Sequence, residues 1–263
     1  MKNKIYMVDT FTDVPFTGNP ACVCILSEDR DDKWMQSFAF EMNLSETAFI
    51  ILKEEEVFLR WFTPKTEIEL CGHATLASAH VLWETRLVDP EKPIAFNTKS
   101  GVLSVKKIGP LIEMDFPIHR HQIADFSLDL LSAFQISPIY VGTFDGRVLV
   151  EVENEDMVKA IEPDFNKLKK LNTRGVVITS VSASDDIDFV SRYFAPWDGV
   201  DEDPVTGATH CCLGPYWARK LEKKELRAYQ ASSRGGYINM RIERDKVFLA
   251  GNAVTIYEGR IIV

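Results

Sequence analysis

The chain has 263 residues, of which 46% are apolar, so one large domain or two medium ones with a real core are expected. Thirty basic residues against 39 acidic ones give a net charge of −9, which argues against nucleic acid as a partner. No apolar run approaches the roughly 18 residues of a membrane-spanning helix, and residues 1–8 resemble a first strand more than a signal peptide. Five cysteines without a disulfide-framework spacing fit a reduced, cytoplasmic protein that binds no membrane.

The first half of the chain alternates apolar and polar residues along short segments, a pattern typical of β-strands. Strands are expected at residues 5–10, 21–26, 47–52, 57–62, 94–97, 103–108 and 111–116, and helices at residues 31–42 and 74–86. The second half repeats this rhythm. Its strands are expected at residues 140–143, 148–152, 175–181, 188–194, 226–231, 237–243, 247–250 and 254–257, and its helices at residues 126–134, 157–161, 165–171 and 208–221.

This order predicts an α+β fold of two pseudo-symmetric halves, each a curved, mostly antiparallel sheet around one central helix. The polar stretch at residues 117–121 is the natural boundary. Domains are therefore expected at residues 1–117 and 118–263, packed closely because no linker-like segment separates them.

A sequence repeat supports the two halves. Arg-Trp-Phe-Thr-Pro at residues 60–64 recurs as Arg-Tyr-Phe-Ala-Pro at residues 192–196, 132 residues later. Acidic residues follow each copy, and then a small-residue segment at residues 71–75 or 205–209. A repeat at half the chain length predicts two similar domains facing each other across a cleft, where a small-molecule site would lie.

Each small-residue segment leads into a predicted helix, with Gly72 and Gly207 at or near the two helix starts. A helix start presents unpaired N–H groups and a partial positive charge, and a glycine there lets a ligand approach the backbone closely. Two such starts could hold a small anionic substrate. The alternative is ordinary helix capping with tight packing.

Three residues are candidates for acid/base chemistry. Glu46 precedes a strongly apolar strand, where burial would raise the pKa of a carboxyl group and suit a base that must return its proton. It could equally be a solvated glutamate at a strand end. Asp203 precedes the second helix start and could act in catalysis or cap the helix. His73, at the first helix start, is either a catalyst or a structural hydrogen-bonding group.

A two-thiol racemase mechanism can be tested against the repeat. Aligning the Ala-Thr pair at residues 74–75 with the pair at 208–209 gives an offset of 134, which sets Val205 opposite Cys71 and Asp203 opposite Glu69. The second thiol is then missing, and Cys71 is expected to be structural.

Metal and nucleotide chemistry find little support in the motifs. The metal-binding candidates are Cys71, His73, His210, Cys211 and Cys212. Their spacings do not match the usual presentation of zinc ligands, and adjacent helical residues point about 100° apart, so no metal site is expected. The sequence has no GxGxxG, Walker or GxSxG motif, so no nucleotide cofactor or serine hydrolase is expected.

Five motifs, in order along the chain, resemble those of the phenazine-biosynthesis PhzF-like family. They are Phe-Thr-Gly-Asn-Pro at 16–20, Asn-Leu-Ser-Glu-Thr-Ala-Phe at 43–49, Arg-Trp-Phe-Thr-Pro at 60–64, Leu-Cys-Gly-His-Ala-Thr-Leu at 70–76 and Asp-Pro-Val-Thr-Gly-Ala at 203–208. The likeness covers essentially the whole chain. It implies a diaminopimelate-epimerase-like fold, in which the last strand commonly returns to the first domain, and a cofactor-free isomerase. It also favours a homodimer.

Carried over by position, the resemblance implies that Glu46 takes and returns a proton, while His73 and Asp203 orient the substrate and could relay protons. The substrate-binding residues that it implies are Asn19, Ser45, Gly72, Thr206, Gly207 and Thr209. Where the phenazine enzyme tends to carry Gly-Ser-Ala, this chain has Gly-Ala-Thr at residues 207–209. The serine hydroxyl is lost at Ala208, which argues against the phenazine substrate, a dihydro-hydroxyanthranilate, unless Thr206 or Thr209 replaces it.

The function expected from these observations is cofactor-independent isomerisation of a small carboxylate-bearing amino or hydroxy acid, bound in the cleft between the halves. Two alternatives remain open. One is a non-catalytic small-molecule-binding or interaction protein on the same fold. The other is an amino-acid racemase or epimerase in which Glu46 and His73 replace the missing thiol chemistry.

Overall fold

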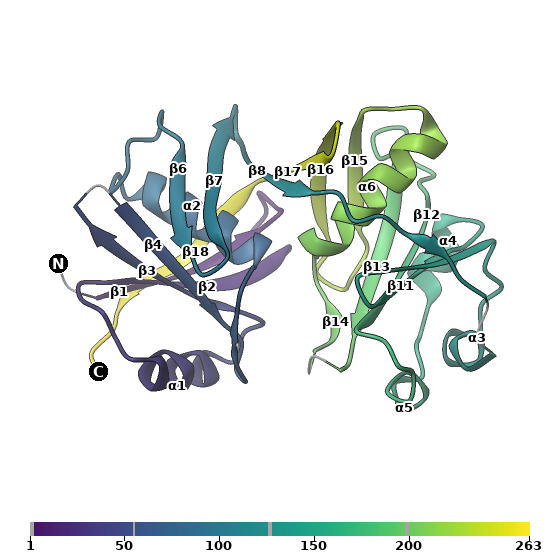
Figure 1. Ribbon diagram of the computed structural model, residues 1–263, viewed down its shortest axis with the longest axis horizontal. Coiled ribbons are helices and arrows are strands. Elements are labelled where there is room, and N and C mark those ends of the chain that lie inside the picture. Colours follow the sequence, from purple (N-terminus) through teal and green to yellow (C-terminus); the bar gives the residue numbers. More distant parts are fainter. Residues whose placement is uncertain (1–2, 55, 126–127, 198–199) are drawn as a thin grey trace. The chain divides into compact units, whose positions relative to one another are not determined.

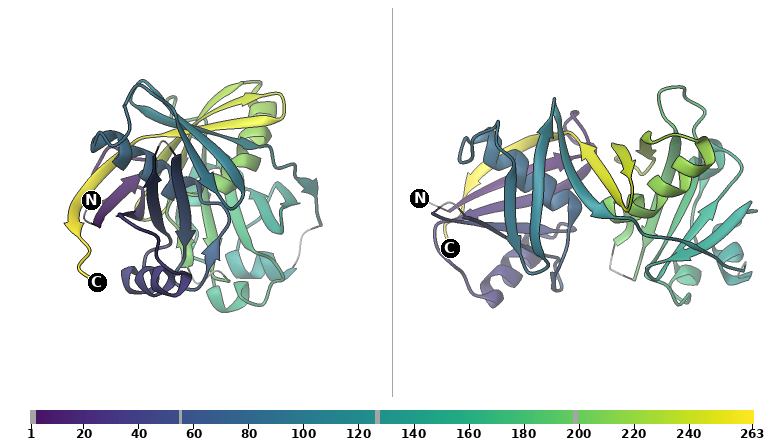
Figure 2. Two further views of the ribbon diagram at one scale, coloured as in Figure 1. Left: turned by 60° about the vertical axis from the view of Figure 1, so that its left-hand side comes forward. Right: turned by 45° about the horizontal axis from the view of Figure 1, so that its top comes forward.

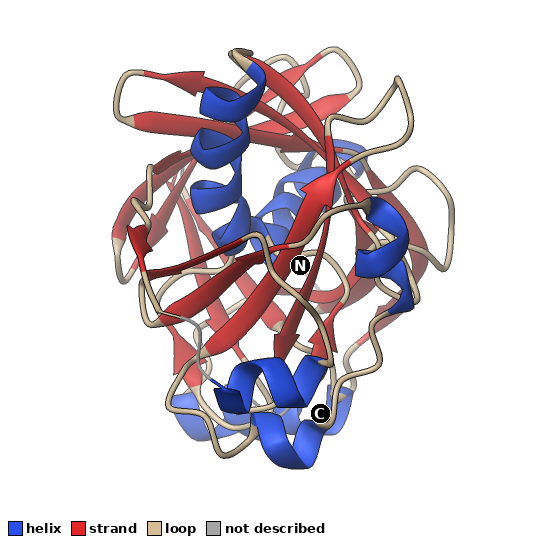
Figure 3. Ribbon diagram, turned by 90° about the vertical axis from the view of Figure 1, so that its right-hand side faces the viewer, coloured by secondary structure: helices blue, strands red, loops and turns tan. Residues whose placement is uncertain are grey.

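The computed structural model describes residues 3–54, 56–125, 128–197 and 200–263. Residues 126 and 127 of the expected helix at 126–134 lie outside this part, and the rest of that helix is α3 (Leu128–Phe134). The chain divides into two compact units, Met1–Asp115 with Ala250–Val263 and Phe116–Leu249. In the described part of the chain, more residues lie in strands than in helices (Figure 3). None of the described helices is long and apolar enough to cross a membrane.

The first unit is built on one mostly antiparallel sheet. Its strands lie in the order β18, β1, β2, β3, β4, β6, β7 and β8, with parallel pairing only at β2–β3 and β4–β6. A short strand, β5, pairs with the end of β4 on the same edge as β6. The bounds are β1 (Lys4–Thr10), β2 (Asn19–Leu26), β3 (Thr47–Lys53), β4 (Glu56–Phe62), β5 (Glu67–Ile68), β6 (Ile94–Thr98), β7 (Gly101–Ile108), β8 (Leu111–Pro117) and β18 (Ala253–Arg260).

The last strand belongs to the first unit. β18 pairs antiparallel with β1 along the whole length of β1 (Figure 2). Residues 250–263, which the sequence pattern groups with the second half, therefore complete the first sheet, as the strand return in epimerase-like folds implies.

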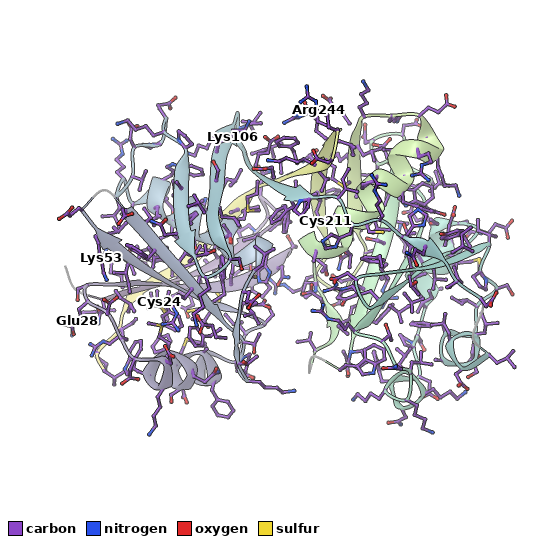
Figure 4. The ribbon with its side chains drawn as sticks, in the orientation of Figure 1. Cys24, Glu28, Lys53, Lys106, Cys211 and Arg244 are labelled. Atoms are coloured by element: carbon purple, nitrogen blue, oxygen red, sulfur yellow. The ribbon has the colours of Figure 1, made fainter. Side chains whose placement is uncertain are left out.

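The first unit has one buried helix and one surface helix (Figure 1). Ten of the 13 residues of α2 (Gly72–Glu84) are buried, which explains its small and aliphatic composition. It packs on β1, β2, β3 and β18. The amphipathic α1 (Asp32–Met42) buries Met35 and Ala39 against side chains of the sheet, among them Cys24 (Figure 4).

The second unit repeats this plan. Its main strands lie in the order β9, β10, β11, β12, β13, β15 and β16. Among the described residues of these strands, the parallel pairs are β11–β12 and β13–β15, and β14 pairs with β13. The bounds are β9 (Gln122–Ile123), β10 (Tyr140–Phe144), β11 (Arg147–Glu151), β12 (Gly175–Val181), β13 (Phe189–Ala195), β14 (Val200–Asp203), β15 (Glu225–Gln230), β16 (Gly236–Glu243) and β17 (Lys246–Gly251).

The helices of the second unit also divide into one central helix and a covering layer. Nine of the 15 residues of α6 (Gly207–Leu221) are buried. The helices α3, α4 (Glu155–Ala160) and α5 (Phe165–Leu168) pack an apolar cluster against β10, β11, β12 and β13. The expected α+β architecture of two similar halves is confirmed.

The sequence repeat corresponds to a repeated ion pair. Arg60 of β4 holds Glu67 of β5 through two hydrogen bonds of 2.7 and 2.8 Å. Arg192 of β13 holds Glu202 of β14 in the same way, at 2.7 and 2.9 Å. Each pair fixes the short strand that leads toward the central helix.

The helix starts correct the alignment of the repeat. Since α2 begins at Gly72 and α6 at Gly207, the offset there is 135 rather than 134. Thr206, and not Val205, is therefore the counterpart of Cys71. The pairing of Glu69 with Asp203 is also wrong. Ile68 pairs with Trp61 of β4, and Asp203 pairs with Tyr193, the equivalent residue of β13, so Ile68 is the counterpart of Asp203. The Ala-Thr pairs that give the offset of 134 match by chance within the helices.

Candidate active site

Glu46 stands one residue before β3, in the connection from α1. Asn43 ends that helix in the left-handed conformation, with φ of 52°, and turns the chain toward the sheet. The carbonyl oxygen of Glu46 accepts a hydrogen bond from the Cys22 N–H at 3.4 Å, which ties this point of the backbone to β2. The Glu46 side chain is 18% exposed.

The Glu46 carboxylate meets the His73 imidazole. The distance from Glu46 Oε2 to His73 Nε2 is 3.3 Å, and Ser45 Oγ lies 3.4 Å from the same nitrogen. The His73 side chain is only 8% exposed. The structure therefore brings together Ser45, Glu46 and His73, three of the predicted site residues, from a loop and a helix start.

The other imidazole nitrogen of His73 faces a thiol. Cys71 Sγ lies 3.5 Å from His73 Nδ1, and Cys71 is the N-cap residue of α2. When Glu46 is ionised, a neutral His73 that donates from Nε2 leaves Nδ1 to accept from the Cys71 thiol. Cys71, expected only to pack, is thus placed to fix the tautomer of His73. This role was not predicted, because the sequence suggests for Cys71 only a nucleophile, a metal ligand or a structural residue.

The same three residues form a potential metal-binding cluster. One donor atom from each of Glu46, Cys71 and His73 lies within 4.8 Å of the others. Of these three residues, the sequence offers Cys71 and His73 as metal-binding candidates but not Glu46. A three-residue donor set can hold zinc with one open position, so chelation is a direct test of the expected metal independence.

The N-terminus of α2 is not capped by a side chain. The first hydrogen bond that reaches back from the helix runs from the Thr75 N–H to the Cys71 carbonyl oxygen at 3.2 Å. The N–H groups of Gly72 and Ala74 therefore have no acceptor within the helix. These donors, next to Glu46, suit a carboxylate.

Asn19 is the first residue of β2 and is fully buried. Its carbonyl oxygen accepts a hydrogen bond from the Thr10 hydroxyl at 2.9 Å. It lies on the strand beside β3, three residues before the Cys22 N–H that bonds to Glu46. Its substrate-binding role stays a prediction.

Asp203 and Thr206 form the corresponding group in the second unit. The Thr206 hydroxyl donates to Asp203 Oδ2, so it does not cap α6. Buried Gln230 braces the turn: its Nε2 donates to the Asp203 carbonyl oxygen at 2.7 Å, and its Oε1 accepts from the Thr206 N–H at 2.9 Å. No motif pointed to Gln230, which lies 24 residues further along the chain.

The remaining predicted residues of the second unit, Thr206, Gly207 and Thr209, differ in whether a hydrogen-bond donor is still available for a ligand. The hydroxyl of Thr209 donates to the Thr206 carbonyl oxygen at 2.9 Å, and both donors of Thr206 are engaged. The backbone N–H of Gly207, in the first turn of α6, has no acceptor within the helix. Of the three, Gly207 is therefore the best anion donor. Replacement of the lost serine hydroxyl by Thr206 or Thr209 would require one of these bonds to break.

The histidine and the thiols of α6 are held in the core. His210 Nδ1 lies 2.8 Å from the Thr206 carbonyl oxygen, and burial lowers the pKa of His210 to about 4. Burial raises the pKa of the Cys211 and Cys212 thiols to about 12, which disfavours the thiolate that a metal would need.

In its described part, the second unit has no residue equivalent to the carboxylate of Glu46. By the register of β3–β4 and β12–β13, the counterpart of Glu46 is Gly175. A Cβ atom there would lie 2.3 Å from the Tyr193 hydroxyl, so the second unit has no room for a side chain at this position. Neither Glu46 nor Cys71 has a like residue in the other unit.

Comparison with known proteins gives consistent matches over the whole chain. A family model described as phenazine biosynthesis-like protein matches residues 8–259. An uncharacterized isomerase of Halalkalibacterium halodurans is 50% identical over 264 residues, which cover 100% of both chains. A PhzF-family crystal structure from Enterococcus faecalis is 37% identical and aligns with a TM-score of 0.95 over 100% of both chains.

A more distant structure extends the likeness of the fold. A probable proline racemase from Agrobacterium radiobacter aligns with a TM-score of 0.69 over 99% of this chain and 93% of that one. Its identity is 10%, so this likeness concerns the fold alone. The expected epimerase-like fold class is confirmed.

Proposed function

The chain belongs to the phenazine biosynthesis-like family, and we propose that it is a cofactor-independent isomerase that moves a proton on a small carboxylate-bearing amino or hydroxy acid. The single observation that carries this proposal is the contact of 3.3 Å between Glu46 and His73 beside an uncapped helix start. A base, a hydrogen-bonding partner and an anion-binding backbone then occur within one short stretch of the fold.

The proposed reaction begins with the substrate carboxylate at the N-terminus of α2, where the N–H groups of Gly72 and its neighbours donate to it. Glu46 takes a proton from a carbon beside the carboxylate or along a conjugated acid. The electron pair of the broken C–H bond moves into the conjugated system. Glu46, now protonated, returns the proton to a different carbon, so that substrate and product have the same composition.

His73 supports Glu46 in this scheme by donating from Nε2 to the carboxylate, which holds the carboxylate in one orientation between the two transfers. Ser45 offers a hydroxyl at the same nitrogen. The family resemblance assigns Asp203 the role of orienting the amino and hydroxyl groups of the substrate. The backbone N–H of Gly207 is assigned to anion binding. Asn19, Thr206 and Thr209 remain weaker candidates.

An isomerase with one base is favoured over a racemase. A racemase that inverts a carbon takes the proton from one face and delivers it to the other, which generally requires two acid/base groups. The repeat offers no second copy of Glu46, since Gly175 stands in its place, and Thr206 stands in place of Cys71. A base that removes and returns one proton agrees better with this asymmetry.

Hydrogen–deuterium exchange in D₂O tests the proposal. Wild type would be incubated with dihydro-hydroxyanthranilate and a panel of small amino and hydroxy acids, and deuterium at carbon followed by NMR. Deuterium entering one compound together with formation of its isomer would support the reaction and identify the substrate class. Tight binding of a compound without exchange would instead favour a non-catalytic binding protein.

A further inference from the structure

The first unit contains a second feature suited to a ligand, on the face of the sheet that α1 covers. A cavity of about 360 Å³ lies there, and all of its lining residues fall between Asp29 and Lys99. Met35 and Ile51, both buried, and Phe58 give it an apolar wall. This volume suits a small organic molecule.

Four basic side chains line the cavity: Arg30, Lys53, Arg60 and Lys99. Arg60 and Lys99 are engaged by acids, since both bind Glu67 and Arg60 also binds Asp32 at 2.7 Å. Lys53 Nζ lies 2.6 Å from Asp29 Oδ2 at the end of β3 (Figure 4). Of these acids, Asp29 lines the cavity, whereas Glu67 and Asp32 do not.

Arg30 differs from the other three. Its Nη2 is 3.4 Å from Glu28, and its Nε is buried without a hydrogen-bond partner among the described residues. Its guanidinium carbon lies over the Trp34 ring, 5.2 Å from the ring centre. The Arg30 side chain as a whole is 31% exposed, so the rest of the guanidinium is the part that a ligand can reach.

The cavity is separate from the group around Glu46. Side chains alternate along β3, so that Phe49 and Ile51 face α1, whereas Glu46 meets His73 of α2. Ile51 lies five residues along the chain from Glu46, which corresponds to about 17 Å of extended strand.

We propose that this cavity binds a small amphipathic carboxylate. The terminal guanidinium nitrogens of Arg30 donate to the carboxylate, Lys53 supplies a second positive charge, and Met35, Ile51 and Phe58 contact the hydrocarbon part. A single negative charge suits the cavity better than a phosphate, because Asp29 already neutralises part of the positive charge. The proposal does not depend on the reaction proposed for Glu46.

The test uses 2-naphthoate as the probe and the indole N–H resonance of Trp34 as the reporter. Tryptophan labelled with ¹⁵N gives one indole resonance for each of the five tryptophans, and Trp34→Phe assigns that of residue 34. We expect a saturable shift of the Trp34 resonance. Arg30→Gln should weaken binding about tenfold, equivalent to about 1.4 kcal/mol. Lys53→Gln should weaken it by a smaller factor, and high salt should do the same.

Two control variants keep the result specific. Lys106→Gln removes an exposed lysine of β7 that does not line the cavity, and it should leave the affinity unchanged (Figure 4). Glu46→Gln should also bind 2-naphthoate as wild type does. Unchanged affinity in both Arg30→Gln and Lys53→Gln, or no shift of the Trp34 resonance, would overturn the proposal. A shift that disappears in Glu46→Gln would also overturn it, because the probe would then be reporting on the other site.

Discussion

Replacing Cys71 by alanine tests how His73 is held. The substitution removes the thiol that lies 3.5 Å from His73 Nδ1 and leaves the Glu46 contact at Nε2 in place. If the thiol selects the tautomer that donates to Glu46, the imidazole of the variant will sample the other tautomer and other ring orientations. Proton transfer by Glu46 should then slow without being abolished.

The size of the effect follows from the hydrogen bond that the substitution removes. A neutral hydrogen bond contributes about 0.5–1.5 kcal/mol, which corresponds to a rate reduced about 2- to 12-fold. KM should change little, since the N–H groups of α2 that are proposed to bind the carboxylate are untouched. Cys71→Ser, which keeps a donor in a shorter side chain, should recover part of the rate.

The assay combines the rate of deuterium exchange with the ¹⁵N chemical shifts of the His73 ring, which distinguish the two tautomers. A variant with unchanged rate and unchanged ring shifts would refute the reasoning, because the thiol would then only fill space. A folded Cys71→Ala protein without any activity would refute it in the opposite direction, because the thiol would then be a catalytic group in its own right.

Three further predictions concern stability and metal. Because burial lowers the pKa of His210 to about 4 from an unfolded value of about 6.5, the unfolded chain binds the extra proton first, so stability is lost as pH falls below 6.5. The His210 contribution to this loss should reach about 2 kcal/mol at pH 5, so the loss in His210→Asn should be smaller by that amount, measured by urea unfolding at pH 7 and 5. Gln230→Leu, which breaks the bonds to Asp203 and Thr206, should cost about 2–4 kcal/mol in the same assay, and a cost below 1 kcal/mol would contradict the bracing role. EDTA should leave the exchange rate unchanged, whereas loss of rate restored by zinc would make Glu46, Cys71 and His73 a metal centre.

Local patterns explain how much of the fold could be predicted. Alternation of apolar and polar residues identified the long strands, and α2 and α6 begin at the two glycines that the repeat singled out. The strands β5, β9 and β14 were missed because two to four residues are too few to show a period. The pairing of β18 with β1 joins segments about 250 residues apart, which no local pattern encodes.

In the candidate site, too, local motifs identified single residues, whereas the contacts between them could not be predicted. Glu46 and His73 were identified as separate candidates, and their contact depends on how the end of α1 and the start of α2 are turned. The bracing of Asp203 by Gln230 has no sequence signature, because it depends on where β15 ends beside the start of α6. The alignment of the repeat failed by one residue at Cys71, since two-residue identity within a helix is weaker evidence than the helix start itself.

The most direct test of the central claim is the exchange rate of Glu46→Gln relative to wild type. Glutamine keeps the size and the hydrogen-bonding capacity of the side chain but cannot accept the proton from carbon. The proposal predicts a rate reduced at least about 100-fold with unchanged unfolding, while Glu69→Gln, a control acid of the same unit, stays near wild type. A Glu46→Gln protein that exchanges deuterium at the wild-type rate would contradict the proposal that this carboxylate carries the proton.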